Sequence, residues 1–210
     1  MGVLTKQYIA EDCLLGIWEI TETFDQLYPI VTLTGQEENT LRHFLNEKRK
    51  VEWLSVRALL KNMLKQEASI IYNKENKPFL HDLSHNISIS HSQNLTAILI
   101  SKNKRVGIDL EYMSHQIEQL AEKFINEEEY ISVDPAKRNH HLYIHWCAKE
   151  SVYKICDKQD INFKQNITIH SFEPDNEGEI TATVNNRFGV EEYDLHYSNY
   201  NNYVIAWCTK

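Results

Sequence analysis

The sequence is poor in glycine and proline, with six and four residues respectively, and it contains only four cysteines. So few glycines and prolines argue against long disordered or low-complexity segments. No C-x-x-C pair occurs, which disfavours both a zinc knuckle and a disulfide framework. We expect a folded protein whose cysteines are reduced packing residues, namely Cys13, Cys147, Cys156 and Cys208.

Long apolar runs and an excess of positive charge are missing as well. No stretch approaches the roughly 18 apolar residues of a membrane span, and the first residues lack the basic and apolar regions of a signal peptide. The formal net charge is −8, whereas general nucleic-acid binders gain affinity by neutralising phosphates with Lys and Arg. We therefore expect a cytoplasmic protein that binds neither membranes nor nucleic acid.

The first half of the chain alternates between strand and helix patterns. Residues 1–35 mix short apolar runs with turn residues, which predicts strands and loops. From about Glu37 to Gln66, apolar residues recur at a spacing of three to four, which predicts one amphipathic helix or two. The alternation at residues 87–90 predicts a strand, and residues 95–100 predict a second one.

The second half repeats a similar order. Residues 106–111 predict a short strand, followed by helices over about residues 116–131 and 137–156, before residues 161–210 return to strands with a turn at Asn185 and Asn186. Each half thus offers a long helix and paired strands. We predict an α+β fold of two similar halves, residues 1–104 and 105–210.

Two acidic residues on the predicted strand 106–111 are candidate metal ligands. Asp109 and Glu111 lie two residues apart, so both carboxylates leave the same face of the strand. Hard oxygen ligands of this kind suit a magnesium ion that keeps several of its waters. The same pair is also compatible with a solvated strand face or an ion-pair partner.

A second candidate segment is WCAKESVYK at residues 146–154. On a helix, Glu150 and Lys154 are neighbours at a spacing of four, and Trp146 lies one turn before Glu150. The spacing alone favours a surface ion pair with Trp146 as a core anchor. Earlier in the same predicted helix, His140, His141 and His145 lack the H-E-x-x-H order of a zinc site, and we do not predict one.

Ser90, His91 and a basic stripe could serve a phosphate. Ser90 and His91 lie at the end of an apolar strand, where they could bind phosphate or form a turn; adjacent strand residues face opposite ways, which disfavours a catalytic pair. The basic residues fall within the predicted helix 37–66, where such stripes are usually solvated. They are Arg49, Lys50, Arg57 and Lys61.

Taken together, these segments resemble the 4′-phosphopantetheinyl transferase superfamily, in particular its surfactin-synthetase-activating type, which is built from two halves related by a pseudo-twofold axis. VGIDLE at residues 106–111 and WCAKESVYK at 146–154 correspond to the family's two signature motifs, in the right order and at a fitting separation. Supporting matches are NKP at 76–78, ISHS at 89–92 and RKVEWLSVR at 49–57. The resemblance covers most of the chain from residue 49 onward.

The resemblance implies a role for each matching residue. Asp109, Glu111 and Glu150 would bind magnesium, and Glu150, Lys154 and His91 would act in catalysis. The residues implied in coenzyme A binding are Arg49, Arg57, Lys77, Pro78, Ser90, His91, Lys149 and Lys154. Asn76 departs from the glycine that many members have before Lys-Pro, but Asn also tolerates a left-handed backbone.

The implied reaction is transfer of the phosphopantetheine arm of coenzyme A to a serine of an apo acyl or peptidyl carrier protein, leaving adenosine 3′,5′-bisphosphate. Residues 1–104 would contribute to coenzyme A binding, and residues 105–210 would carry the magnesium and catalytic motifs, in a monomer. Two alternatives remain open: a magnesium-dependent phosphoesterase, which the same carboxylates would suit, and a non-catalytic module that binds coenzyme A or a carrier.

Overall fold

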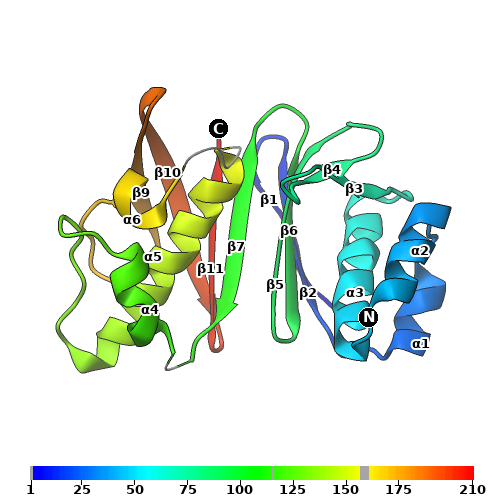
Figure 1. Cartoon of the computed structure of the whole chain (residues 1–210). Coiled ribbons are helices and arrows are strands. Elements are labelled where there is room, and N and C mark those ends of the chain that lie inside the picture. Colours follow the sequence, from blue (N-terminus) through cyan, green and yellow to red (C-terminus); the bar gives the residue numbers. More distant parts are fainter. Residues whose placement is uncertain (1, 115, 157–160) are drawn as a thin grey trace. The chain divides into compact units, whose positions relative to one another are not determined.

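The computed structural model describes residues 2–114, 116–156 and 161–210, and the chain divides into two compact units. One unit spans Met1–Lys104 and the other Arg105–Lys210 (Figure 1). Each unit has its own buried apolar cluster and its own antiparallel sheet with a long helix packed on it. The mixed α+β class is therefore as predicted. None of the described helices is both long and apolar enough to cross a membrane.

The N-terminal unit is built on a four-stranded sheet in the order β1-β2-β6-β5, with a separate hairpin of β3 and β4. Its strands are β1 (Val3–Ala10), β2 (Cys13–Glu19), β3 (Ile70–Tyr72), β4 (Pro78–Leu80), β5 (Asn86–Ser92) and β6 (Leu95–Ser101). Its helices are α1 (Phe24–Leu27), the 3₁₀ turn η1 (Tyr28–Ile30), α2 (Gly35–His43) and α3 (Glu47–Leu64).

The predicted helix at about residues 37–66 is two helices. The chain breaks at Phe44, whose backbone is extended, and α3 begins after Asn46, whose side chain accepts a hydrogen bond from the Lys48 N–H. Helix α3 packs on β2 and β6 at the centre of the sheet, where a Cβ on Gly16 would collide with Met63. The absence of a side chain at Gly16 is therefore what allows this close approach.

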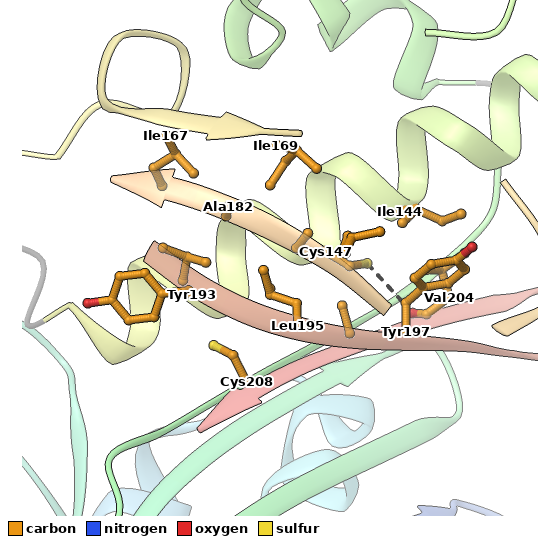
Figure 2. Packing of buried hydrophobic residues seen from close by; sticks show 14 of the residues in the cluster. Ile144, Cys147, Ile167, Ile169, Ala182, Tyr193, Leu195, Tyr197, Val204 and Cys208 are labelled. Atoms are coloured by element: carbon orange, nitrogen blue, oxygen red, sulfur yellow. Dashed lines mark hydrogen bonds between the residues drawn. The ribbon is translucent and has the colours of Figure 1, made fainter. Parts of the chain in front are cut away.

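The C-terminal unit is built on a five-stranded sheet in the order β7-β11-β10-β9-β8. The strands are β7 (Val106–Tyr112), β8 (Ile167–Ile169), β9 (Glu177–Asn186), β10 (Gly189–Tyr200) and β11 (Tyr203–Thr209). The helices are α4 (Ile117–Phe124), α5 (Pro135–Ile155) and α6 (Phe163–Asn166). Figure 2 shows residues of this unit's core, where α5 packs its buried side chains against the sheet.

Two boundaries in this unit differ from prediction. The helix expected to reach about Ile131 ends at Phe124, because Ile125 is extended and the Asn126 side chain accepts from the Glu128 N–H in a local turn. The turn expected at residues 185–186 falls at Arg187 and Phe188 instead. Asn186 still contributes to it, since its side chain accepts from the Phe188 N–H at 2.8 Å.

Candidate active site

The two signature segments lie side by side in the C-terminal unit. Strand β7 carries Asp109 and Glu111, and its register partners on β11 are Ala206 and Val204 respectively. Helix α5 is bonded at the same two positions of β11: Ser151 donates to the Ala206 carbonyl at 2.8 Å, and the Cys147 thiol to the Val204 carbonyl at 3.6 Å (Figure 2). The strand of the first segment and the helix of the second therefore meet along one stretch.

Gly107 accounts for the close approach of α5 to β7. A Cβ at this position would overlap with the Ser151 carbonyl oxygen, so no residue with a side chain fits without moving the helix. The small residues Cys147 and Ser151 on the facing side of α5 are also fully buried. Local sequence thus brings α5 against the strand that carries the two carboxylates.

The carboxylates of β7 affect the pKa of a thiol on α5. Burial raises the pKa of Cys147 well above its usual range, and the negative charges of Asp109 and Glu111 raise it further. Asp109 is almost fully buried, whereas Glu111 is half-buried. Both carboxylates therefore make ionisation of this thiol less favourable.

Lys154 neutralises Asp109 directly. Its Nζ lies 2.6 Å from Asp109 Oδ1 and donates to the Ile108 carbonyl at 2.8 Å. The pair joins the two signature segments by a charged contact between partly buried groups, with side-chain exposures of 20% for Lys154 and 6% for Asp109. Lys154, expected from spacing alone to pair with Glu150 on the helix surface, thus reaches across to the strand.

Glu150 lines a small pocket that also has four aromatic residues in its walls. The pocket has a volume of about 420 Å³. We call it the aromatic pocket; its aromatic residues are Phe124, Trp146, Tyr153 and Phe163. Trp146 makes edge and tilted contacts with Phe124 and Phe163, at centroid distances of 5.2 Å and 5.6 Å. Glu150 thus adds a carboxylate to a pocket lined otherwise by aromatic, aliphatic and a few polar side chains.

The donor chemistry at this point fits a magnesium ion. Magnesium is commonly held by one or two carboxylates together with waters and the phosphates of a substrate, and Asp109 and Glu111 present two such carboxylates on one face of β7. Across the described ranges, no three His, Cys, Asp or Glu side chains are gathered closely enough to enclose a metal. Closure of the predicted set by Glu150 therefore stays a prediction.

Lys149, predicted to contact phosphate, is enclosed in the core. Its exposure is 0%, and its ammonium group is bonded to Glu129 and to three backbone carbonyls. Sequence reasoning missed this because lysine is rarely buried, and because Glu129 lies 20 residues away, in the part of the predicted helix 116–131 that follows the end of α4. The location does not present Lys149 to a ligand.

In the N-terminal unit, Arg49 and His91 lie in contact with each other, and the resemblance implied both in coenzyme A binding. Arg49 Nη1 donates to His91 Nε2 at 2.6 Å, and Glu52 lies beside both, 3.4 Å from the guanidinium. His91 is exposed and Arg49 is half-buried, whereas Ser90 is buried on the opposite face of β5. This pair offers an exposed cationic group at the end of the sheet.

Arg57 differs from Arg49 because both it and its acidic partner are buried. It is 4% exposed, its Nε donates to Glu37 Oε1 at 2.9 Å, and its guanidinium stacks on the Trp53 ring at 3.1 Å. Burial lowers the pKa of Arg57, and the charge of Glu37 opposes that shift. Arg57 and Trp53 line a cleft of about 860 Å³ that also includes Tyr72.

Lys77 lies just before β4, and Pro78 is the first residue of that strand. Asn76 has φ of +60°, so it adopts the left-handed backbone that we expected it to tolerate in place of glycine. The Asn73 side chain accepts from the Lys77 N–H at 2.8 Å and shapes the same turn. The loop of the NKP segment therefore forms with asparagine at its left-handed position.

Comparison with known proteins matches the C-terminal unit to one family. Residues 105–208 match the family described as the 4′-phosphopantetheinyl transferase superfamily. The chain is similar to the 4′-phosphopantetheinyl transferase HetI of Nostoc sp. (strain PCC 7120 / SAG 25.82 / UTEX 2576), with 25% identity over 139 residues, covering 59% of each chain.

A second relative is the 4′-phosphopantetheinyl transferase gsp of Aneurinibacillus migulanus, with 36% identity over 89 residues. That match covers 41% of this chain and 37% of the relative. The alignments thus span less than two thirds of the length of either relative.

Proposed function

Since the chain belongs, through residues 105–208, to the 4′-phosphopantetheinyl transferase superfamily, we propose that it transfers the phosphopantetheine arm of coenzyme A to a serine of an apo acyl or peptidyl carrier protein. The products would be the holo-carrier and adenosine 3′,5′-bisphosphate. The observation that carries the proposal is the contact between the two signature segments, in which Lys154 on α5 binds Asp109 on β7 at 2.6 Å.

We assign magnesium to Asp109 and Glu111, with Glu150 as third ligand. When bound there, the ion would supply positive charge for the pyrophosphate of coenzyme A, which is chemistry that phosphoryl transfer requires. The oxygen-only donors of β7 support this choice over a transition metal, because thiolate and imidazole ligands are the ones that favour zinc or copper.

The remaining steps fall to side chains of this chain. Glu150 would take the proton of the carrier serine, directly or through a water, and Lys154 would offset the charge that grows on the leaving phosphate. His91 and Arg49 would hold a phosphate of coenzyme A by charge-assisted hydrogen bonds. Ser90, Lys77 and Pro78 would also contact bound coenzyme A, as the resemblance implies.

Two predicted phosphate contacts have less support. Arg57 is stacked on Trp53 and paired with Glu37, so a phosphate would have to compete with an existing ion pair. Lys149 lies wholly inside the C-terminal unit. We propose that Arg57 acts from the floor of its cleft, and we give Lys149 a different role below.

The aromatic pocket suits the pantetheine arm. The arm is an uncharged chain with methyl groups and two amides, and small-molecule sites are lined mostly by apolar and aromatic groups with a few polar ones. Glu150 lines the pocket, so an arm lying in it would end next to the proposed base.

The N-terminal unit would supply the other contacts to coenzyme A in a single chain, as the pseudo-twofold members of the family do. In this proposal, Arg49, His91 and the NKP loop bind coenzyme A, which is the donor substrate. The carrier protein is then the second substrate, and the protein would act as a monomer in the cytoplasm.

Mass spectrometry of an apo-carrier protein tests the proposal directly. The carrier is incubated with the protein, coenzyme A and magnesium, and a phosphopantetheine adduct on the carrier serine is the expected result. Cleavage of coenzyme A without an adduct would indicate a phosphoesterase, and binding of coenzyme A with neither product would indicate a non-catalytic module. Either outcome would overturn the proposal.

A further inference from the structure

A positive charge lies in the interior of the C-terminal unit and takes no part in the proposed chemistry. Lys149 Nζ donates to the carbonyl oxygens of Phe124 at 2.6 Å, Ile167 at 2.8 Å and Phe163 at 3.0 Å, and to Glu129 Oε2 at 2.8 Å. An isolated ammonium ion in such a place would be strongly unfavourable, so these oxygens are what allow it to stay charged. Burial lowers the pKa of Lys149, and Glu129 opposes that shift.

Glu129, the carboxylate partner of Lys149, is also held by several contacts. Burial alone would raise the pKa of Glu129, but His145 and Lys149 outweigh it, and the pKa is lowered. Glu129 also accepts from the Ile169 N–H at 2.8 Å. The residues around Lys149 therefore form one connected polar network inside an apolar core, an arrangement that fixes its members in place.

The three carbonyls come from three separate segments that meet at Lys149. Phe124 is the last residue of α4, Phe163 the first of α6 and Ile167 the first of β8. Two of these residues, Phe124 and Phe163, also line the aromatic pocket, on either side of Trp146. One ammonium group thus ties together the backbones that carry two walls of the pocket.

We propose that Lys149 is a positioning residue: it holds the walls of the aromatic pocket at the spacing that admits the pantetheine arm, and it does not touch the phosphates of coenzyme A. This inference rests on the proposed function for the identity of the ligand. A lysine has three N–H donors and no acceptor, and the four oxygens around Nζ already engage them. A phosphate contact would require breaking part of this network.

The test compares Lys149→Met with the wild-type protein. Methionine fills a similar volume without the charge, so the tie between α4, α6 and β8 is lost. The matched control is Lys164→Met, which removes an exposed lysine that also donates to a backbone carbonyl, that of Glu122 at 3.0 Å. Two readouts are used: the affinities for coenzyme A and for adenosine 3′,5′-bisphosphate, and the aromatic circular dichroism, to which Trp146 contributes.

The expected result is a selective loss. Lys149→Met should weaken coenzyme A binding by about tenfold and change the aromatic spectrum, while adenosine 3′,5′-bisphosphate, which lacks the pantetheine arm, binds within about twofold of wild type. Lys164→Met should leave both readouts unchanged. Equal weakening of both ligands with an unchanged spectrum would show a direct phosphate contact and overturn the inference.

A second variant tests the same inference if Lys149→Met does not fold. Glu129→Gln keeps the lysine but removes its only charged partner among the described residues. A positioning role predicts the same selective loss of coenzyme A affinity, smaller in size. If Lys149 served phosphates, releasing its ammonium would instead strengthen the binding of coenzyme A and of adenosine 3′,5′-bisphosphate alike, and this result would overturn the inference. The aromatic circular dichroism reports on the packing of the pocket and does not depend on formation of holo-carrier by the wild-type protein. Failure of this inference can therefore be distinguished from failure of the proposed function.

Discussion

The ammonium nitrogen of Lys154 lies 2.6 Å from one carboxylate oxygen of Asp109, which is one of the proposed magnesium ligands. A cation of the protein itself therefore occupies the space next to the oxygen at which a metal ion would bind. The two charges of like sign must share Asp109 or compete for it. Lys154 should therefore affect two quantities in opposite directions. Its charge should weaken the binding of the metal ion, and it should increase turnover.

Removing the charge of Lys154 should strengthen metal binding. We expect Lys154→Met to bind Mn²⁺ about tenfold more tightly than wild type, the effect of one close charge that changes binding by about 1.4 kcal/mol. The same variant should form less holo-carrier, because the charge that offsets the leaving phosphate is gone. Free Mn²⁺ measured by electron paramagnetic resonance gives the affinity. Lys137→Met, an exposed lysine of the same helix, is the control; a wild-type affinity in Lys154→Met would refute competition at Asp109.

Removing the proposed base should affect turnover far more than binding. We expect Glu150→Gln to lower kcat by about 10²–10⁴-fold, as loss of general acid–base catalysis does, with a smaller effect on the Kd of coenzyme A. Holo-carrier formation and calorimetry give the two quantities. Glu122→Gln on the exposed side of α4 should change neither. Losses of equal size in kcat and in coenzyme A affinity would contradict the assignment of Glu150.

The local patterns predicted the site's framework well. The pattern at residues 106–111 and the long apolar period after residue 137 correspond to β7 and α5, because both elements bury apolar residues and pack on each other. The i, i+2 spacing of Asp109 and Glu111 correctly predicted a shared face. Asn76, expected to tolerate a left-handed backbone, has φ of +60°.

Contacts between distant residues could not be predicted in the same way. Arg57 finds Glu37 twenty residues earlier, and Lys149 finds Glu129 twenty residues earlier, in each case inside a packed core. Spacing on one helix can predict only partners three or four residues away, so Lys149 and Arg57 read as exposed charges. Which charge is buried depends on tertiary packing, and one sequence does not contain that information in local form.

The contact of α5 with β7 should be intolerant of any side chain at position 107. Gly107→Ala places a methyl group against the Ser151 carbonyl, so α5 must shift, and overpacking of this kind costs about 1–3 kcal/mol of unfolding free energy. Gly35→Ala is the matched control, because a methyl there meets nothing within 4 Å and alanine favours the helix in which it lies. Urea unfolding measures both. Equal stability of the two variants would show that the helix and strand are not in the close contact described.

The buried histidines of α5 should make the C-terminal unit sensitive to acid. Burial lowers the pKa of His141, the neighbouring His145 and His140 add to the shift, and together they bring the pKa to about 4; the rings of His141 and His145 are both buried. Burial also lowers the pKa of His145, against the opposing charge of Glu129. Each histidine binds a proton more readily in the unfolded chain, so stability falls as the pH drops below the unfolded pKa of about 6.5.

For His141 this loss continues down to about pH 4. Each histidine contributes at most about 1.4 kcal/mol per pH unit within its window. His141→Asn removes the titrating ring and keeps an oxygen that can accept from the Ser132 N–H, which His141 Nδ1 accepts at 3.1 Å. Urea midpoints measured between pH 7.5 and about pH 4.5 should therefore fall less steeply in this variant than in wild type. Parallel midpoint curves would show that folding does not lower the pKa of His141, and that the acid sensitivity of this unit comes from other groups.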